Sequence, residues 1–197
     1  MTLILASQSP RRKQLLSQLG AEFTIEVADI DETPLANESP AAYVERLAIE
    51  KARVIAERHP SGVCVLGSDT TVVADGKILG KPVDQNDAIN TLLMLSDREH
   101  QVLTSVAVVA MSEAGDPHIW CETVTTQVTM MTITPEQALA YWQTGEPADK
   151  AGSYGLQGIG GAMVRSVKGS YSAVIGLPLS ETAALLAEAG CPTWLNP

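Results

Sequence analysis

Two long segments rich in valine and threonine, residues 101–111 and 119–131, constrain the fold more than any other part of this sequence. Branched side chains of this kind favour extended strands. The two segments follow one another directly, whereas short apolar segments nearer the N-terminus alternate with helix-like ones. Because adjacent strands are combined with strand–helix alternation, the pattern predicts a mixed α/β sheet and not a purely parallel array.

The remaining elements are predicted from their start signals and turns. Serine or threonine followed by proline marks helix starts at Ser9, Ser39 and Thr134, the last with Gln137 as the second half of a capping box. Helices are expected over residues 10–20, 40–58, 84–96 and 178–190, with a further one beginning at 134. Strands are expected over residues 3–6, 23–27, 63–66 and 162–167, with a hairpin over 72–79. The strand over 63–66 is expected to end at Gly67.

Composition excludes several classes of function. The 197 residues, 45% of them hydrophobic, suffice for one large domain or two small lobes with a sizeable core. A formal net charge of −10 argues against a nucleic-acid-binding protein, which needs a basic face. No apolar run reaches the ~20 residues of a membrane span, and no export signal is expected at the N-terminus. Three widely spaced cysteines argue against disulfides and zinc, and favour a reduced cytoplasm.

The segment SQSPRRK, residues 7–13, places three cations in the first turn of a helix. A helix N-terminus carries a partial positive charge, so each cation there is unfavourable by about 0.3–1 kcal/mol. A bound anion reverses that sign, and Ser9, Arg11 and Arg12 offer a hydroxyl and two guanidinium groups to a phosphate. The alternative is a solvated basic surface, and the segment alone does not decide between the two.

Two acidic segments are candidates for metal binding or general-base chemistry. In VLGSDTTVV, Asp69 follows a buried strand, at a position where carboxylates often serve as metal ligands or bases. In DIDET, Asp29, Asp31 and Glu32 are clustered, and such acids can hold Mg²⁺ through oxygen ligands. The structural alternatives are a turn or capping aspartate for Asp69 and an acidic surface loop for DIDET.

Two isolated lysines and a glycine-rich segment complete the polar candidates. Lys51 has no acidic residue three or four positions away, so a helical ion pair is excluded and solvent exposure is the structural alternative. Lys81 is either a phosphate contact or a lysine at a hairpin end. The segment YGLQGIGG, residues 154–161, has neither dinucleotide-binding nor P-loop spacing. Its glycines nevertheless permit close approach to a flat ligand, and Gln157 offers donor and acceptor groups.

In their order along the chain, these segments resemble the Maf family of nucleoside triphosphate pyrophosphatases. The resemblance covers residues 3 to about 190 and is carried by LASQSPRRKQLL, DIDET, ERLAIEKA, VLGSDTTVV, LGKP, DKAGSYGLQGIGG and GSYSAVIGLPL. It implies a single Maf-like domain over residues 1–197, with a mixed, strongly curved sheet, flanking helices and two lobes around a deep cleft. That fold is similar to inosine triphosphate pyrophosphatases. The resemblance also implies a homodimer.

The resemblance further implies that a nucleoside triphosphate is cleaved to the monophosphate and pyrophosphate with a divalent cation, Mg²⁺ or Mn²⁺. Asp69 matches the family's catalytic aspartate and Glu32 its motif glutamate, and both are expected to be metal ligands. The phosphate-binding positions of the family match Ser9, Arg11, Arg12, Lys51 and Lys81.

Arg12, Thr70 and Gln157 fit the specificity positions of the dTTP/UTP branch, and YGLQG is that branch's form of the glycine-rich loop. The expected role is nucleotide-pool house-cleaning, extending to modified pyrimidine triphosphates, with a link to cell-division arrest. One alternative is another base preference, such as 7-methyl-GTP. A second is a non-catalytic nucleotide-binding regulator of cell division. A nucleotidyl transferase would need a second-substrate site that the sequence does not indicate.

Overall fold

The computed structural model describes residues 1–59 and 62–197, and its strands form a seven-stranded sheet. The strands are β1 Thr2–Leu5, β2 Phe23–Ile25, β3 Val63–Ala74, β4 Lys77–Leu79, β5 Glu99–Met111, β6 Pro117–Met130 and β7 Val164–Lys168. Their order is β2-β1-β3-β5-β6-β7, with β4 paired to β3. β1 is parallel to β2 and β3, whereas β4 and β7 are antiparallel to β3 and β6. The predicted mixed α/β sheet is therefore confirmed.

The helices begin where the sequence signals placed them. They are α1 Pro10–Gln18, α2 Pro40–Ala56, α3 Gln85–Leu95, α4 Pro135–Gln143, α5 Tyr171–Ile175 and α6 Leu179–Glu188. Three 3-10 segments, η1 Glu146–Asp149, η2 Ala151–Ser153 and η3 Ile159–Met163, follow α4. The side chains of Ser9, Ser39 and Thr134 each accept a hydrogen bond from the first turn of their helices, and Thr134 and Gln137 form the predicted capping box. The short helix α5 was not predicted.

The predicted end of a strand at Gly67 is wrong. β3 continues through Gly67 to Ala74, so Asp69 lies within a long strand and not after a short one. A Cβ atom at Gly67 would lie 2.3 Å from the carbonyl oxygen of Ala48 and 2.8 Å from the amide nitrogen of Ala52, both in α2. The glycine therefore serves a close helix–strand contact and does not terminate the strand.

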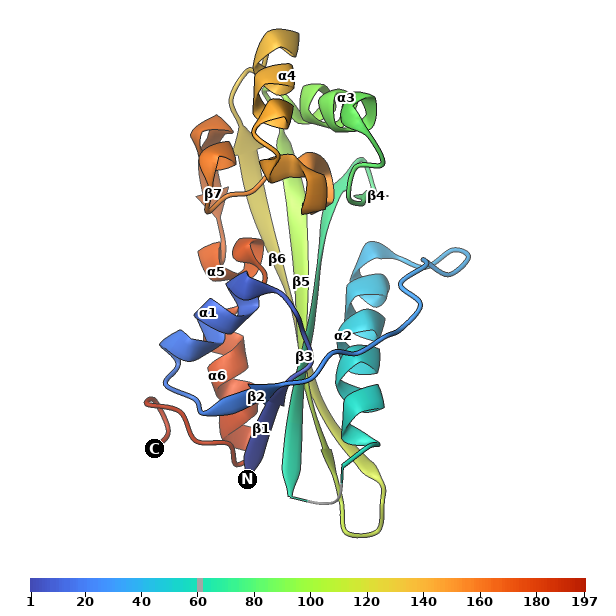
Figure 1. The fold of residues 1–197 in the computed structure, drawn as a ribbon, viewed down its shortest axis with the longest axis vertical. Helices are drawn as coiled ribbons and strands as arrows, with labels where there is room; N and C mark the ends of the chain where they lie inside the picture. The colour runs from blue at the N-terminus through green and yellow to red at the C-terminus, as the bar shows by residue number, and fades with distance from the viewer. Residues whose placement is uncertain (60–61) are drawn as a thin grey trace. The chain divides into compact units, whose positions relative to one another are not determined.

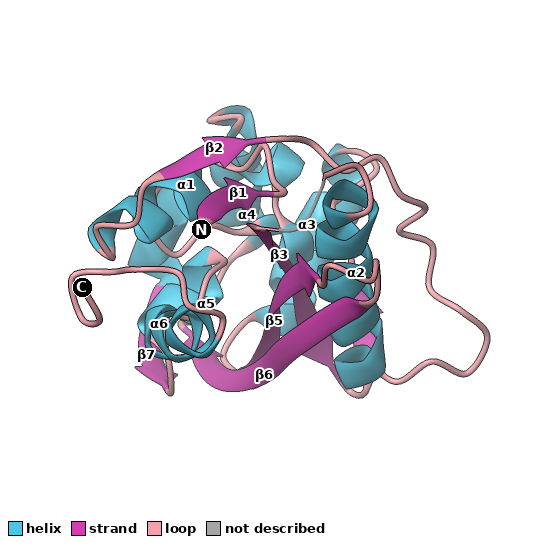
Figure 2. Cartoon of the chain, turned by 90° about the horizontal axis from the view of Figure 1, so that it is seen from below, coloured by secondary structure: helices cyan, strands magenta, loops and turns pink. Residues whose placement is uncertain are grey.

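The chain divides into two compact units, as the resemblance implied; the deep cleft stays a prediction. The first unit comprises Met1–Asp69, Thr104–Val124 and Gly176–Pro197. Within it, α1 and α6 lie on one side of β1 and β3, and α2 lies on the other (Figures 1 and 2). Small and branched apolar side chains fill the contact between α2 and the strands: Ile4, Ala6, Ala52, Ile55, Ala56, Val65 and Val109. This contact fixes α2 against β3.

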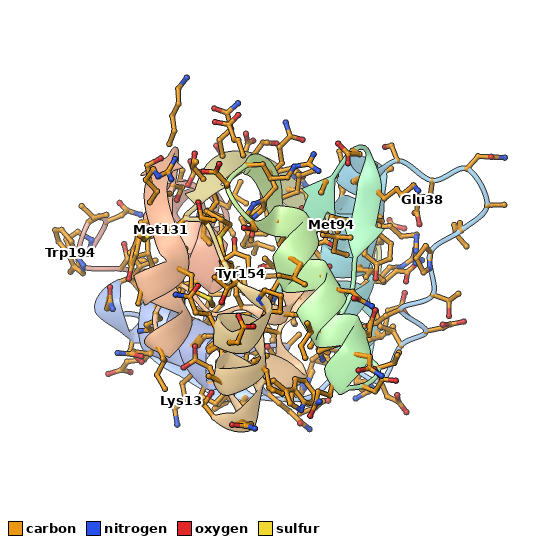
Figure 3. The ribbon with its side chains drawn as sticks, turned by 90° about the horizontal axis from the view of Figure 1, so that it is seen from above. Lys13, Glu38, Met94, Met131, Tyr154 and Trp194 are labelled. Carbon is orange, nitrogen blue, oxygen red and sulfur yellow. The ribbon has the colours of Figure 1, made fainter. Side chains whose placement is uncertain are left out.

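The second unit comprises Thr70–Leu103 and Thr125–Ile175. Its core joins α3 and α4 to the strands and includes Leu92, Leu95, Val102, Met130, Tyr141 and Tyr154. Tyr154, labelled in Figure 3, is buried in this core beside α3. None of the helices in the described parts of the chain is long and apolar enough to cross a membrane.

Candidate active site

A buried lysine joins two carboxylates in the first unit. The Nζ atom of Lys51 in α2 lies 2.7 Å from Oδ1 of Asp69 in β3 and 2.7 Å from Oε1 of Glu32 in the preceding loop. Lys51 and Asp69 are each only 8% exposed. Solvent exposure, the structural alternative for Lys51, is therefore wrong, and three of the predicted site residues are brought together by this one ammonium group.

The local sequence explains how a lysine reaches this place. Lys51 lies in α2 between apolar neighbours that face β3, and the absence of a side chain at Gly67 lets the helix and strand backbones approach closely. The helix–strand contact then places the lysine stem in the core and its ammonium group beside Asp69. The sequence shows no helical partner for Lys51 because its partners lie on strand β3 and in the loop before α2.

The site raises the proton affinity of its central carboxylate. Burial raises the pKa of Asp69 because it disfavours the charged form, while the positive charges of Lys51 and Arg12 oppose the rise. Burial also lowers the pKa of Arg12, and the negative charge of Asp69 counters that effect. A buried carboxylate with raised proton affinity, held beside cations, is the arrangement expected of a general base.

The N-terminus of α1 forms the second part of the site. The hydroxyl of Ser7 accepts a hydrogen bond from the amide of Ser9 at 3.1 Å and one from Nη1 of Arg12 at 3.5 Å. Nε of Arg12 donates to the carbonyl oxygen of Gly176 at 2.9 Å, and the Ser68 hydroxyl donates to the same carbonyl at 3.1 Å. Arg12 is thus tied to the backbone next to Asp69 and does not extend into solvent, as the basic-surface alternative required. Arg11 is half-buried in the same turn.

Two residues of α2 that the sequence did not single out hold the loop that carries Glu32. The hydroxyl of Tyr43 donates to the backbone carbonyl of Glu32 at 3.0 Å, and Nη2 of Arg46 donates to the carbonyl of Thr33 at 3.2 Å. Arg46 also forms a two-point ion pair with Glu38, at 2.6 and 2.8 Å. Glu38, labelled in Figure 3, lies on the loop before α2. These contacts keep the loop over Lys51.

The ionisation states of Glu38 and Tyr43 agree with their contacts to the loop that carries Glu32. The ion pair with Arg46 lowers the pKa of Glu38 to about 2. Burial raises the pKa of Tyr43 to about 12, and the negative charges of Asp69 and Glu32 add to the rise, so its hydroxyl stays a donor. Asp31 is exposed and accepts a hydrogen bond from the amide of Thr33 at 2.9 Å, so this residue fits the acidic surface loop that is the structural alternative for DIDET.

The other predicted site residues belong to the second unit. Thr70 is half-buried in β3, Lys81 is exposed after β4, and Gln157 is exposed in the glycine-rich loop. The first unit therefore assembles Ser9, Arg12, Glu32, Lys51 and Asp69, while the roles assigned to the three residues of the second unit stay predictions.

Within the described ranges, no group of three or more histidine, cysteine, aspartate or glutamate side chains could hold a metal ion. Glu32 and Asp69 offer two carboxylates that approach the same ammonium group. Mg²⁺ is commonly bound by one or two carboxylates together with substrate phosphates and water. The residues present therefore fit a cation that arrives with a phosphorylated substrate.

The model of the family described as Maf-like protein matches residues 2–189, and the chain belongs to this family.

Among its relatives, the dTTP/UTP pyrophosphatase of Colwellia psychrerythraea is 53% identical over 192 residues, which is 95% of this chain and 88% of that protein. The dTTP/UTP pyrophosphatase of Hahella chejuensis is 50% identical over 196 residues, covering 98% of this chain and 94% of that protein. Among solved structures, a HAM1 protein from Coxiella burnetii is similar with a TM-score of 0.42 and 23% identity, over 65% of this chain and 73% of that one.

Proposed function

We propose that this protein is a nucleoside triphosphate pyrophosphatase that hydrolyses dTTP and UTP to the monophosphate and pyrophosphate. The names of its relatives support the activity and the pyrimidine preference. The observation that carries the proposal is the buried Lys51 ammonium group, 2.7 Å from both Asp69 and Glu32, beside the basic N-terminus of α1. This arrangement concentrates cations and a base in one place on an acidic protein.

The basic residues would bind the phosphate chain. A nucleoside triphosphate carries about four negative charges near neutral pH, and a protein of net charge −10 needs local cations to hold it. Ser9, Arg11 and Arg12 at the start of α1 offer a hydroxyl, two guanidinium groups and the helix N-terminus. Lys51 would contribute a further charge from α2, and Lys81 one from the second unit.

Asp69 would act as the general base. Its carboxylate takes a proton from a water molecule whose oxygen forms a bond to the α-phosphorus, while the bond from that phosphorus to the bridging oxygen breaks. Pyrophosphate leaves with the electron pair of the broken bond, and the cations neutralise its charge. Burial strengthens Asp69 as a base, and Lys51 keeps the carboxylate oriented. Positioning and electrostatic stabilisation would then supply most of the rate.

Glu32 and Asp69 would hold the divalent cation, Mg²⁺ or Mn²⁺. When bound, the cation would neutralise charge on the phosphate oxygens. The Glu32 side chain is 52% exposed, so it can reach a cation that arrives with the substrate. Tyr43 and Arg46 bind the backbone carbonyls of Glu32 and Thr33 and limit how far the loop can move.

We assign recognition of the base to Arg12, Thr70 and Gln157, which fit the specificity positions of the dTTP/UTP branch. Uracil and thymine present an N–H group between two carbonyls, and the Gln157 amide can match one donor and one acceptor of that edge. A site built for this pairing rejects a base with the opposite pattern, because buried groups would stay unpaired. Replacing Gln157 with Glu should impair dTTP and UTP hydrolysis more than CTP hydrolysis. Equal losses on all three would exclude this base contact.

The decisive experiment for the function is a panel of all common nucleoside triphosphates, with Mg²⁺ or Mn²⁺ and pyrophosphate release as the readout. We expect dTTP and UTP to be the best substrates and pyrophosphate, not inorganic phosphate, to be the product. Release of inorganic phosphate would contradict attack at the α-phosphorus. Nucleotide binding without turnover would instead favour a regulator of cell division.

A further inference from the structure

Glu146, in η1, accepts hydrogen bonds from both the preceding helix and the glycine-rich loop. Its Oε1 accepts from the Tyr141 hydroxyl at 2.7 Å and from the amide of Gly160 at 2.9 Å. Its Oε2 accepts from the amide of Ile159 at 2.8 Å. The Tyr141 hydroxyl in turn accepts from the amide of Gly155 at 3.0 Å. All of these residues belong to the second unit.

The glycines of the loop make room for these two side chains. A Cβ atom at Gly158 would lie 2.2 Å from Oε2 of Glu146, and one at Gly160 would lie 2.4 Å from the Tyr141 hydroxyl oxygen. At these two positions the glycines accommodate the protein's own carboxylate and phenol. The sequence predicted that these glycines permit the close approach of a flat ligand. At Gly158 and Gly160 the groups that approach closely are the side chains of Glu146 and Tyr141.

The hydrogen-bond donors around Glu146 favour the ionised form of its carboxyl group. Burial opposes ionisation of this carboxyl group, but hydrogen bonds from Tyr141, Gly160 and Ile159 outweigh it and lower the pKa of Glu146. Burial and the adjacent Glu146 both raise the pKa of Tyr141, so its hydroxyl keeps the proton that it donates. An ionised carboxylate has acceptor oxygens for all three donors, whereas an amide would face at least one of them with N–H groups.

We propose that Glu146 is a positioning residue that sets the conformation of the loop over residues 155–160 and thereby presents Gln157 to the pyrimidine base. Gln157 lies midway between the two anchored points, Gly155 on one side and Ile159 with Gly160 on the other. Glu146 acts on base recognition through this loop and not by contact with the nucleotide. The inference rests on the proposed hydrolysis of dTTP and UTP, and it adds a residue outside the predicted site that affects base selectivity by positioning Gln157.

The test is a double-mutant cycle between Glu146→Gln and Gln157→Ala, read as kcat and KM for dTTP and UTP. Glu146→Gln should raise KM about tenfold or more and leave kcat within about threefold, because the N–H group of the half-buried amide would face a backbone N–H group of the loop. The double variant should lose no more than Gln157→Ala alone, since Glu146 acts through Gln157. Glu113→Gln, the same chemical change in an exposed turn, should leave both constants unchanged.

Several outcomes would overturn the inference. If the two losses multiply in the double variant, Glu146 acts independently of Gln157. If kcat falls and KM does not rise, the loop does not position the base. Should Glu146→Gln fail to fold, Tyr141→Phe replaces it in the cycle, because it removes the hydroxyl contacts to Glu146 and Gly155 and places no N–H group against the loop amides. A wild-type chain that releases no pyrophosphate from either nucleotide overturns the proposed function itself, and the inference falls with it.

Discussion

Substitution of Gly67 by alanine should separate α2 from β3 and so displace Lys51 from Asp69. The new Cβ atom would lie 2.3 Å from the Ala48 carbonyl oxygen and 2.8 Å from the Ala52 amide nitrogen. An ordinary close carbon–oxygen contact is about 3.3–3.6 Å, so the two backbones must move apart by about 1 Å. Both obstructing atoms belong to helix backbone and cannot rotate away as a side chain would.

The displacement caused by Gly67→Ala should lower both the melting temperature and the turnover. Overpacking of a well-packed contact costs about 1–3 kcal/mol, and backbone obstruction favours the upper end of that range. For a chain of this size, about 1 kcal/mol corresponds to about 2–4 °C in Tm, so Gly67→Ala should melt about 6–12 °C below the wild type. A shift of about 1 Å in a catalytic group can cost about 100-fold in rate, so turnover should fall by a similar factor.

The assay is thermal unfolding together with pyrophosphate release from dTTP, both at fixed metal concentration. Gly80→Ala is the matched control for stability, because a Cβ atom there meets nothing within 4 Å. Its melting temperature should stay within about 2 °C of the wild type. A Gly67→Ala protein that melts within the same margin and keeps its turnover would refute the reasoning, since the helix–strand contact would then tolerate a side chain.

Three further predictions concern the charged groups. Lys51→Met leaves Asp69 buried without its closest cation and should lower the free energy of unfolding by about 3 kcal/mol in urea titration; a loss below about 1 kcal/mol would show that the pair is unimportant. Burial, aided by the charge of Arg98, lowers the pKa of His100 to about 4 in the folded protein. As the pH falls, the unfolded chain therefore protonates His100 before the folded protein does. The free energy of unfolding should then fall by about 3 kcal/mol between about pH 6.5 and about pH 4. His100→Phe should flatten this dependence, and an unchanged slope would exclude His100 as its source. Removal of divalent metal with a chelator should abolish turnover, and added Mg²⁺ should restore it. The melting temperature should move by less than about 2 °C, because Lys51 already pairs with both carboxylates. Full activity in the presence of the chelator would exclude a role for the metal.

Most of the fold could be predicted because its signals are local. Ser9, Ser39 and Thr134 satisfy the first-turn amides of their helices, and valine-rich segments form the long strands, so neighbouring residues determine these elements. The end of β3 could not be predicted in this way. A glycine in a strand indicates either a break or a close contact, and only the position of α2 decides which applies at Gly67.

The site was predictable in its chemistry and not in its geometry. The basic residues at the start of α1 left an anion site and a solvated basic surface both open, because the contact of Arg12 with the distant Gly176 carbonyl could not be found in the sequence. The partners of Lys51 are 19 residues away at Glu32 and 18 residues away at Asp69, so no helical spacing could find them. Tyr43 and Arg46 donate to backbone carbonyls of a loop. Because every residue has such a carbonyl, the sequence does not indicate which ones accept these bonds.

The most direct test of the central claim is the turnover of Asp69→Asn with dTTP and Mg²⁺. The amide keeps the shape of the side chain and removes the charge that would accept the proton of the attacking water. The account predicts a loss of about 100-fold or more, in the range known for removal of a general base, in a protein that still unfolds cooperatively. A loss of less than about tenfold, roughly 1.4 kcal/mol of barrier, would contradict it.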